Sequence, residues 1–186
     1  MSEITRKLRD EILLIKIKHG SREAFAEVYD AYADSLYRFV FYRVATPETA
    51  EDITADLFLR VFQHLTNNEI KVQNLRAYLY QTARNLIADH YRLKNEDISL
   101  DDLVEVGDSQ IEEDNIEQIF NLQEIESALL KIKSEFREVI VLAHIEGFSH
   151  KEIGEILGKT PAATRVILHR ALTELRGVLR VRNISH

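Results

Sequence analysis

The chain has 186 residues, 45% of them apolar, which is enough to bury the core of one ordinary domain or of two small ones. It contains no cysteine, which excludes a disulfide scaffold and a thiolate metal site, and only two prolines and six glycines, a composition typical of a mostly helical protein. We expect a cytoplasmic protein without membrane insertion, because no stretch has the layout of a signal peptide or the length of a membrane span.

Charge is unevenly distributed along the chain. The net charge is −7, yet residues 95–127 hold twelve Asp or Glu and no Lys or Arg. Residues 71–94 hold five basic residues against one acidic, and residues 149–182 hold seven against three. Because nucleic-acid affinity depends on local basic patches, the acidity of the whole chain does not exclude nucleic acid as a partner.

The first block of sequence, residues 10–93, has the pattern of four helices. The expected helices are residues 10–19, a helix that follows Ser21 as its N-cap, residues 47–65 and residues 75–93. In the third of these, apolar residues recur at every fourth position from Ile53 to Leu65, which predicts one buried stripe.

An acidic stretch, residues 94–120, follows and is interpreted as a flexible linker. The last block, residues 121–181, again has helical patterns. They cover residues 122–133, 134–146, 149–157 and 161–176. The expected fold is therefore all-α, with two small helical domains joined by an acidic linker.

The last two of these helices have the spacing of a helix-turn-helix. Ser149 and Glu152 have capping-box spacing, Gly158 ends the first helix, and Thr160 with Pro161 starts the second. The exposed start of the second helix would offer small and basic side chains to a DNA major groove. A helical hairpin that binds protein, or nothing, has the same spacing.

No metal, nucleotide or nucleophile site is indicated. The histidines at 144, 150 and 169 lack the pairing that zinc requires, and no Gly-rich phosphate loop is present. We therefore expect no cofactor and no catalytic residue, as for a protein that is not an enzyme.

Two motif blocks resemble the extracytoplasmic-function (ECF) group of bacterial sigma factors. The stretches AEDITADLFLRVF and LRAYLYQTARNLIADHYR are similar to region 2 of that family. FREVIVLAHIEGFSHKEIGEILGKTPAATRVILHRALTELR is similar to region 4. The resemblance covers about residues 10–180, with 10–93 as region 2 and 121–181 as region 4. It implies a transcription initiation factor that binds core RNA polymerase and promoter DNA and is often restrained by an anti-sigma factor.

The resemblance also places roles on particular residues. It assigns polymerase binding to Asp52, Asp56 and Leu59, and Ala55 replaces a Gln that is frequent in the family. Contacts to the melted minus-ten element are expected from Lys71, Asn74, Arg76, Tyr78, Arg84, Asn85 and Arg92, with either Tyr78 or Tyr80 in the core instead. Contacts to the duplex minus-thirty-five element are expected from Thr160, Ala162, Ala163, Thr164, Arg165, His169 and Arg170.

One departure from the family pattern affects the second DNA element. Val166 and Ile167 stand where the family has a polar Ser and a basic residue, so base contacts at these two positions are not expected. Two other classes of protein stay open on the sequence. One is a helix-turn-helix regulator that acts without polymerase, and the other is a helical protein that sequesters a partner and binds no DNA.

Overall fold

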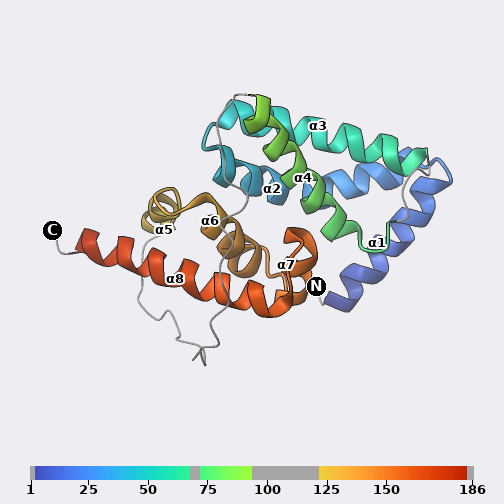
Figure 1. Ribbon diagram of the computed structural model, residues 1–186. Helices are drawn as coiled ribbons and strands as arrows, with labels where there is room; N and C mark the ends of the chain where they lie inside the picture. The colour runs from blue at the N-terminus through green and yellow to red at the C-terminus, as the bar shows by residue number, and fades with distance from the viewer. Residues whose placement is uncertain (1–2, 68–71, 94–121, 184–186) are drawn as a thin grey trace. The chain divides into compact units, whose positions relative to one another are not determined.

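The computed structural model describes residues 3–67, 72–93 and 122–183, and all regular structure within these ranges is helical (Figure 1). The chain divides into two compact units, Met1–Ile98 and Ser99–His186. The all-α class with two domains is thus confirmed. The expected linker, 94–120, lies outside the described residues. No helix in the described ranges is long and apolar enough to cross a membrane.

The N-terminal unit is built from helices that pack on one another in all combinations. They are α1 (Glu3–Lys18), α2 (Arg22–Val44), α3 (Pro47–Thr66) and α4 (Leu75–Leu93). The stripe predicted on α3 is confirmed, because Ile53, Leu57, Val61 and Leu65 are all buried. α1 begins seven residues before the predicted start, since residues 3–9 contain no Gly or Pro that would stop it.

The ends of α2 are set by local hydrogen bonds. Ser21 caps it as predicted, and its Oγ accepts the backbone N–H of Ala24 at 3.1 Å. At the other end Ala45 takes a left-handed conformation (φ 57°) and its N–H donates to the carbonyl of Phe41 at 2.8 Å. The chain therefore reverses within two residues and enters α3 at Pro47.

A buried polar contact joins α1 to α2. The hydroxyl of Tyr32 donates to Oδ2 of Asp10 at 2.5 Å, and both side chains are buried. Burial raises the pKa of the Asp10 carboxyl, while the Tyr32 hydrogen bond and the guanidinium groups of Arg6, Arg9 and Arg76 oppose that rise. The contact fixes α1 against the rest of its unit, because a buried carboxyl is costly to leave without a partner.

The helices of the C-terminal unit differ in length from the sequence pattern. They are α5 (Leu122–Leu129), α6 (Ser134–Ile140), a π-helical turn η1 (Val141–Ile145), α7 (His150–Leu157) and α8 (Pro161–Asn183). α5 ends four residues before the predicted end. The buried guanidinium of Arg137 donates to the carbonyls of Leu129, Leu130 and Ile132 at 2.6–3.1 Å. These bonds satisfy carbonyls that a longer helix would have used itself.

α7 and α8 form the predicted helix-turn-helix. The side chains of Ser149 and Glu152 form the complete capping box, with Oε2 of Glu152 accepting the Ser149 N–H at 2.9 Å. Gly158 ends α7 in the left-handed conformation (φ 67°), which glycine adopts without strain. α8 continues seven residues past the predicted end, so Gly177 lies within the helix.

The turn between these helices lies directly on α7. A Cβ atom added to Gly154 would come within 2.6 Å of the backbone oxygen of Lys159. The N–H of Lys159 in turn donates to the carbonyl of Gly154 at 2.8 Å. Since backbone meets backbone at this point, a side chain at position 154 requires the turn to move.

Gly154→Val should therefore destabilise the C-terminal unit, whereas Gly177→Val should not. Both substitutions change intrinsic helix propensity equally, but Gly177 has open space where a Cβ would lie. We expect the free energies of unfolding of the two variants to differ by about 1–3 kcal/mol, the usual cost of overpacking. Urea denaturation followed by circular dichroism measures this difference, and equal stabilities would contradict the close approach.

Candidate functional site

The exposed face of α8 begins at its N-terminus. Thr160 caps the helix, because its Oγ1 accepts the N–H of Ala163 at 3.2 Å. Ala162, Arg165 and His169 follow at helical spacing on one exposed face, and Arg170 is exposed beside them. The first turn of this face is small and its second turn is basic, as a helix entering a DNA groove requires.

Thr164 does not belong to this face. Its side chain is fully buried and its hydroxyl donates to the carbonyl of Thr160 at 3.0 Å. The expected DNA contact from Thr164 is therefore wrong in this structure, since the side chain packs toward Gly154 at the turn. Ile167 is buried as well, while Val166 is half-buried between this core and the exposed face. The apolar residue at 167 thus packs in the core of the unit.

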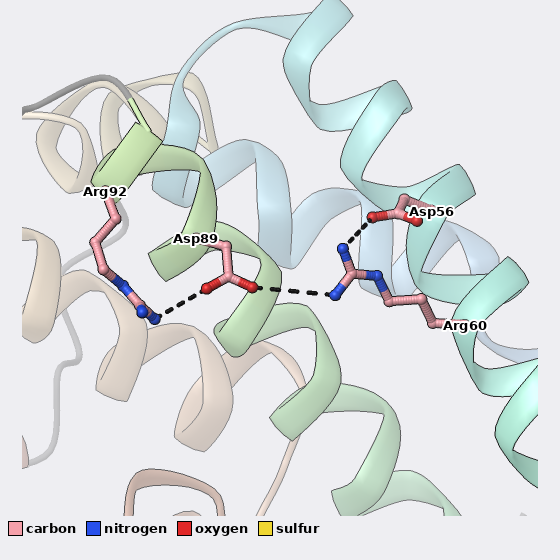
Figure 2. A network of polar contacts seen from close by, with 4 residues as sticks. All are labelled: Asp56, Arg60, Asp89 and Arg92. Atoms are coloured by element: carbon pink, nitrogen blue, oxygen red, sulfur yellow. Dashed lines mark ion pairs between the residues drawn. The ribbon is translucent and has the colours of Figure 1, made fainter.

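The side of α3 that carries Asp52 and Asp56 leads into a line of charges shared with α4. Asp56 forms an ion pair with Arg60 at 3.1 Å, and Arg60 lies 4.0 Å from Asp89 of α4 (Figure 2). Asp89 also binds Arg92 at 2.9 Å. Negative and positive groups alternate along this line and all are partly exposed.

Two residues that were predicted to bind partners form ion pairs within this line of charges. Asp56 and Arg92 already have partners within the chain, whereas Asp52 is exposed. Exposed ion pairs contribute only about 0–1 kcal/mol each. A binding partner can therefore replace these contacts at small cost.

An apolar groove lies between α2 and α3, next to the side of α3 that carries Asp52 and Asp56. Its volume is about 500 Å³. It is lined by Arg22, Phe25, Ala26, Tyr29, Asp30, Phe58, Leu59 and Phe62. The ring centroids of Phe25 and Phe62 are 4.9 Å apart, and those of Tyr29 and Phe58 are 4.7 Å apart. Leu59, with 56% of its surface exposed, belongs to this groove.

The sequence reasoning missed the groove. Its rings come from two helices, and only their spacing of four, at Phe25 with Tyr29 and Phe58 with Phe62, was visible. Such spacing is also the ordinary signature of a core stripe. Pairing α2 with α3 was needed to show that part of both stripes stays exposed.

The exposed face of α4 carries Gln81, Asn85 and Arg92, with Arg84 half-buried beside them. Gln81 lies one turn before Asn85 on the same face and was not among the predicted residues. Amide groups of this kind donate and accept hydrogen bonds at base edges.

The two tyrosines of α4 differ in environment, as expected. Tyr80 is fully buried, with its ring centroid 5.1 Å from that of Phe39. Tyr78 is half-buried and its hydroxyl shares a hydrogen bond with Nδ1 of His64 at 2.7 Å. The prediction that one of the two belongs to the core is confirmed.

Three other residues predicted to contact the minus-ten element have different positions. Arg76 is buried with only 6% of its surface exposed, so the prediction of a surface contact is wrong in this structure. Its charge acts inside the unit, where it opposes the rise that burial causes in the pKa of Asp10. Asn74 caps α4 through its Oδ1, which accepts the N–H of Ala77 at 3.1 Å. Lys71 lies outside the described residues.

No group of three metal-ligating side chains occurs in the described part of the chain. The described surfaces offer hydrogen bonding, charge and apolar contact. Three surfaces stand out: the α8 face, the α4 face, and the acidic side of α3 with its adjoining groove.

Comparison with known proteins gives matches in both units. The model of sigma-70 region 2 matches residues 28–96, and that of sigma-70 region 4 matches residues 122–175. The ECF RNA polymerase sigma factor SigW of Bacillus subtilis is 31% identical over 176 residues, 89% of this chain and 94% of SigW. The ECF RNA polymerase sigma factor BldN of Streptomyces coelicolor is 27% identical over 170 residues, 90% of this chain. The match spans only 64% of BldN, less than two thirds of its length.

Solved structures share the fold. CnrH, solved with the cytosolic domain of CnrY, has a TM-score of 0.69 and 22% identity, covering 93% of this chain and 98% of CnrH. RpoE of Bartonella quintana, solved with the anti-sigma factor NepR, has a TM-score of 0.65 and 22% identity, covering 84% of this chain and 97% of RpoE.

A helical unit that matches region 2, followed by a helix-turn-helix unit that matches region 4, defines a bacterial transcription initiation factor. The chain belongs to the extracytoplasmic-function group of the sigma-70 family.

Proposed function

We propose that this chain binds core RNA polymerase and directs it to promoters by reading two DNA elements, one with each unit. The exposed face of α8 carries the proposal, because a capped helix with a small first turn and a basic second turn suits a major groove. The chain contributes recognition, and the polymerase supplies the chemistry of RNA synthesis.

The minus-thirty-five element is proposed to be read as duplex by α8. Ala162 and Ala163 allow the helix backbone to approach the groove floor, and Arg165 projects from the same end of the helix. An Arg in this position binds a guanine edge through two hydrogen bonds or a phosphate through its charge. His169 and Arg170 extend the contact one turn further along the helix.

The minus-ten element is proposed to be read as a melted strand by α4. Asn85 and Gln81 offer amides to unpaired base edges, while Arg84 and Arg92 suit phosphates. Tyr78 is a candidate platform for a base because its ring is only half-buried. Lys71 stays in the proposal on the family pattern alone.

The polymerase contact is proposed on the acidic side of α3. Asp52 and Asp56 lie one turn apart on the same side of the helix, and Leu59 adds an apolar surface next to them. Arginines of a partner would pair with both carboxylates. Asp56 would then exchange its internal partner Arg60 for one on the polymerase.

A restraining partner is also proposed. Membership of the ECF group supports an anti-sigma factor as the regulator of this chain. RpoE of Bartonella quintana, which shares the fold, was solved in complex with the anti-sigma factor NepR. A partner that covers the faces of α4 or α8 would block promoter binding directly.

Transcription in a purified system tests the function. Core polymerase with this chain should start RNA at defined positions on genomic DNA fragments from the source organism, and core alone should not. The start sites are mapped by sequencing the 5′ ends of the transcripts. Absence of any factor-dependent start site across the genome would sink the proposal, provided that a known sigma factor activates the same core preparation.

Removing the two carboxylates of α3 should weaken polymerase binding. Asp52→Asn with Asp56→Asn is expected to raise the Kd for core by about 10-fold or more, because charge-assisted pairs at an interface are worth more than about 1 kcal/mol. Fluorescence anisotropy with labelled chain measures the Kd. Glu155→Gln, on α7, removes one charge from the other unit and should leave it unchanged. An unaltered Kd for the double variant would refute the assignment to this side of α3.

Arg165→Ala should weaken recognition of the minus-thirty-five element. If Arg165 reads a base, the loss is about 1–3 kcal/mol and preference at one base pair is relaxed. If it contacts phosphate, binding weakens uniformly and the salt dependence falls by about one unit of slope. Binding of the chain–core complex to promoter variants at several salt concentrations separates the two. Arg180→Ala, further along α8, is the charge-matched control, and a variant at 165 that behaves like this control would exclude Arg165 from the interface.

A further inference from the structure

Helix α1 is apolar on two opposite faces. One face carries Leu13, Leu14 and Ile17, which are buried against the rest of the N-terminal unit. The outer face is also apolar, but it is exposed to solvent. It exposes Ile4, Leu8, Ile12 and Ile15, with 80%, 58%, 46% and 59% of their surfaces accessible.

These four aliphatic side chains form one continuous stripe. Their spacing of four, four and three residues keeps them on the same side of a helix, over a length of about 16 Å. A surface helix normally turns charged and polar residues outward opposite its core face. Contiguous exposed apolar residues of this kind mark an interaction surface, whereas scattered ones do not.

The stripe is nearly symmetric about its own midpoint. Along the sequence, Ile4 and Ile15 are equally distant from the point between Arg9 and Asp10. The distances of Leu8 and Ile12 from this point differ by one residue. If a second α1 packed antiparallel on this face, Ile4 would lie opposite Ile15 of the other copy and Leu8 opposite Ile12. Self-complementarity of this form is what a twofold contact between identical chains requires.

The charges beside the stripe have the same symmetry. Lys7 and Glu11, one turn apart, border the same side of it. In an antiparallel pair this side faces its equivalent, so each Lys7 would lie near Glu11 of the other copy. Because of the twofold symmetry, two equivalent pairs of Lys7 and Glu11 would form between the copies. On the other side, Arg9 pairs with Glu27 of its own chain at 3.8 Å, which reduces repulsion between copies.

We infer that two copies of this chain associate through the outer faces of their α1 helices, packed antiparallel. One helix face buries less than the roughly 1,600 Å² of a standard interface, so we expect the dimer to be weak. An anionic membrane surface suits the face less well. Interfacial helices carry aromatic anchors and a wholly basic border, whereas this stripe has no aromatic residue and Glu11 lies at its edge.

Sedimentation equilibrium on the full chain from about 5 to 500 µM tests the association. The wild-type chain should shift from monomer to dimer across this range. Ile12→Asp should raise the dimer Kd by about 10-fold or more, since it places a carboxylate in the apolar contact of both copies. Leu130→Asp changes a similarly exposed leucine of the other unit and should leave the Kd unchanged. Circular dichroism checks that each variant is folded.

A charge exchange tests the antiparallel register. Lys7→Glu alone should weaken the dimer, because the introduced carboxylate then repels Glu11 of the opposite copy. Lys7→Glu with Glu11→Lys should restore it. Loss of association in both variants, or in neither, would overturn the register.

Engineered cysteines give a second readout, because the chain has no cysteine of its own. A mixture of the Leu8→Cys and Ile12→Cys chains should form the mixed disulfide faster than either chain forms its own. A parallel pair would instead favour disulfides between identical positions.

Three results would overturn the inference itself. The first is a chain that is monomeric at all concentrations, and the second is a dimer unaffected by Ile12→Asp. The third is a monomeric chain that sediments with phosphatidylglycerol vesicles and loses this binding in the Ile12→Asp variant. None of these measurements involves polymerase or promoter DNA. Failure of the dimer is therefore distinguishable from failure of the proposed function.

Discussion

The geometry of the helix-turn-helix depends on the contact between Gly154 and the backbone of Lys159. These two residues approach so closely that no Cβ fits between them, and the hydrogen bond from the Lys159 N–H to the Gly154 carbonyl closes the contact. The contact sets where the turn ends and therefore where α8 begins. The same turn places Thr164 inward and leaves Arg165 outward. The identity of residue 154 thus controls, through the backbone, which side chains of α8 face outward.

The sequence predicted the features that depend on local rules. The Ser149–Glu152 capping box, the Ser21 cap and the α3 stripe follow from spacing along one segment, and all three are confirmed. Helix ends that depend on residues outside the helix were not predictable from the spacing within one segment. α5 stops at Leu129 because the guanidinium of Arg137, eight residues away, takes its terminal carbonyls.

The sequence predicted which helices carry exposed polar faces better than it predicted which residues lie on those faces. Family resemblance pointed to α4 and α8, which do present exposed polar and basic faces, but it also included Arg76 and Thr164, whose side chains are buried. A basic or polar residue in a DNA-binding helix can be buried in the core or can contact the DNA groove. Only the packing of the helix against its neighbours shows which of these roles a residue has. The ion pair between Arg60 and Asp89 and the aromatic groove join different helices, so no pattern within one helix could reveal them.

Charge distribution explains how an acidic chain can read DNA. Residues 95–121 hold ten Asp or Glu and no Lys or Arg, so the net charge of −7 becomes +3 once these ten carboxylates are set aside. The two basic stretches, residues 71–94 and 149–182, each carry a local net charge of only +4, five basic against one acidic and seven against three. Each face alone therefore makes few phosphate contacts and should bind weakly at physiological salt. Two weak faces become effective when a common scaffold holds both of them on one promoter, because the second contact is then intramolecular. If each unit reads one promoter element as proposed, the weakness of each face makes promoter recognition conditional on the polymerase that holds the two units together.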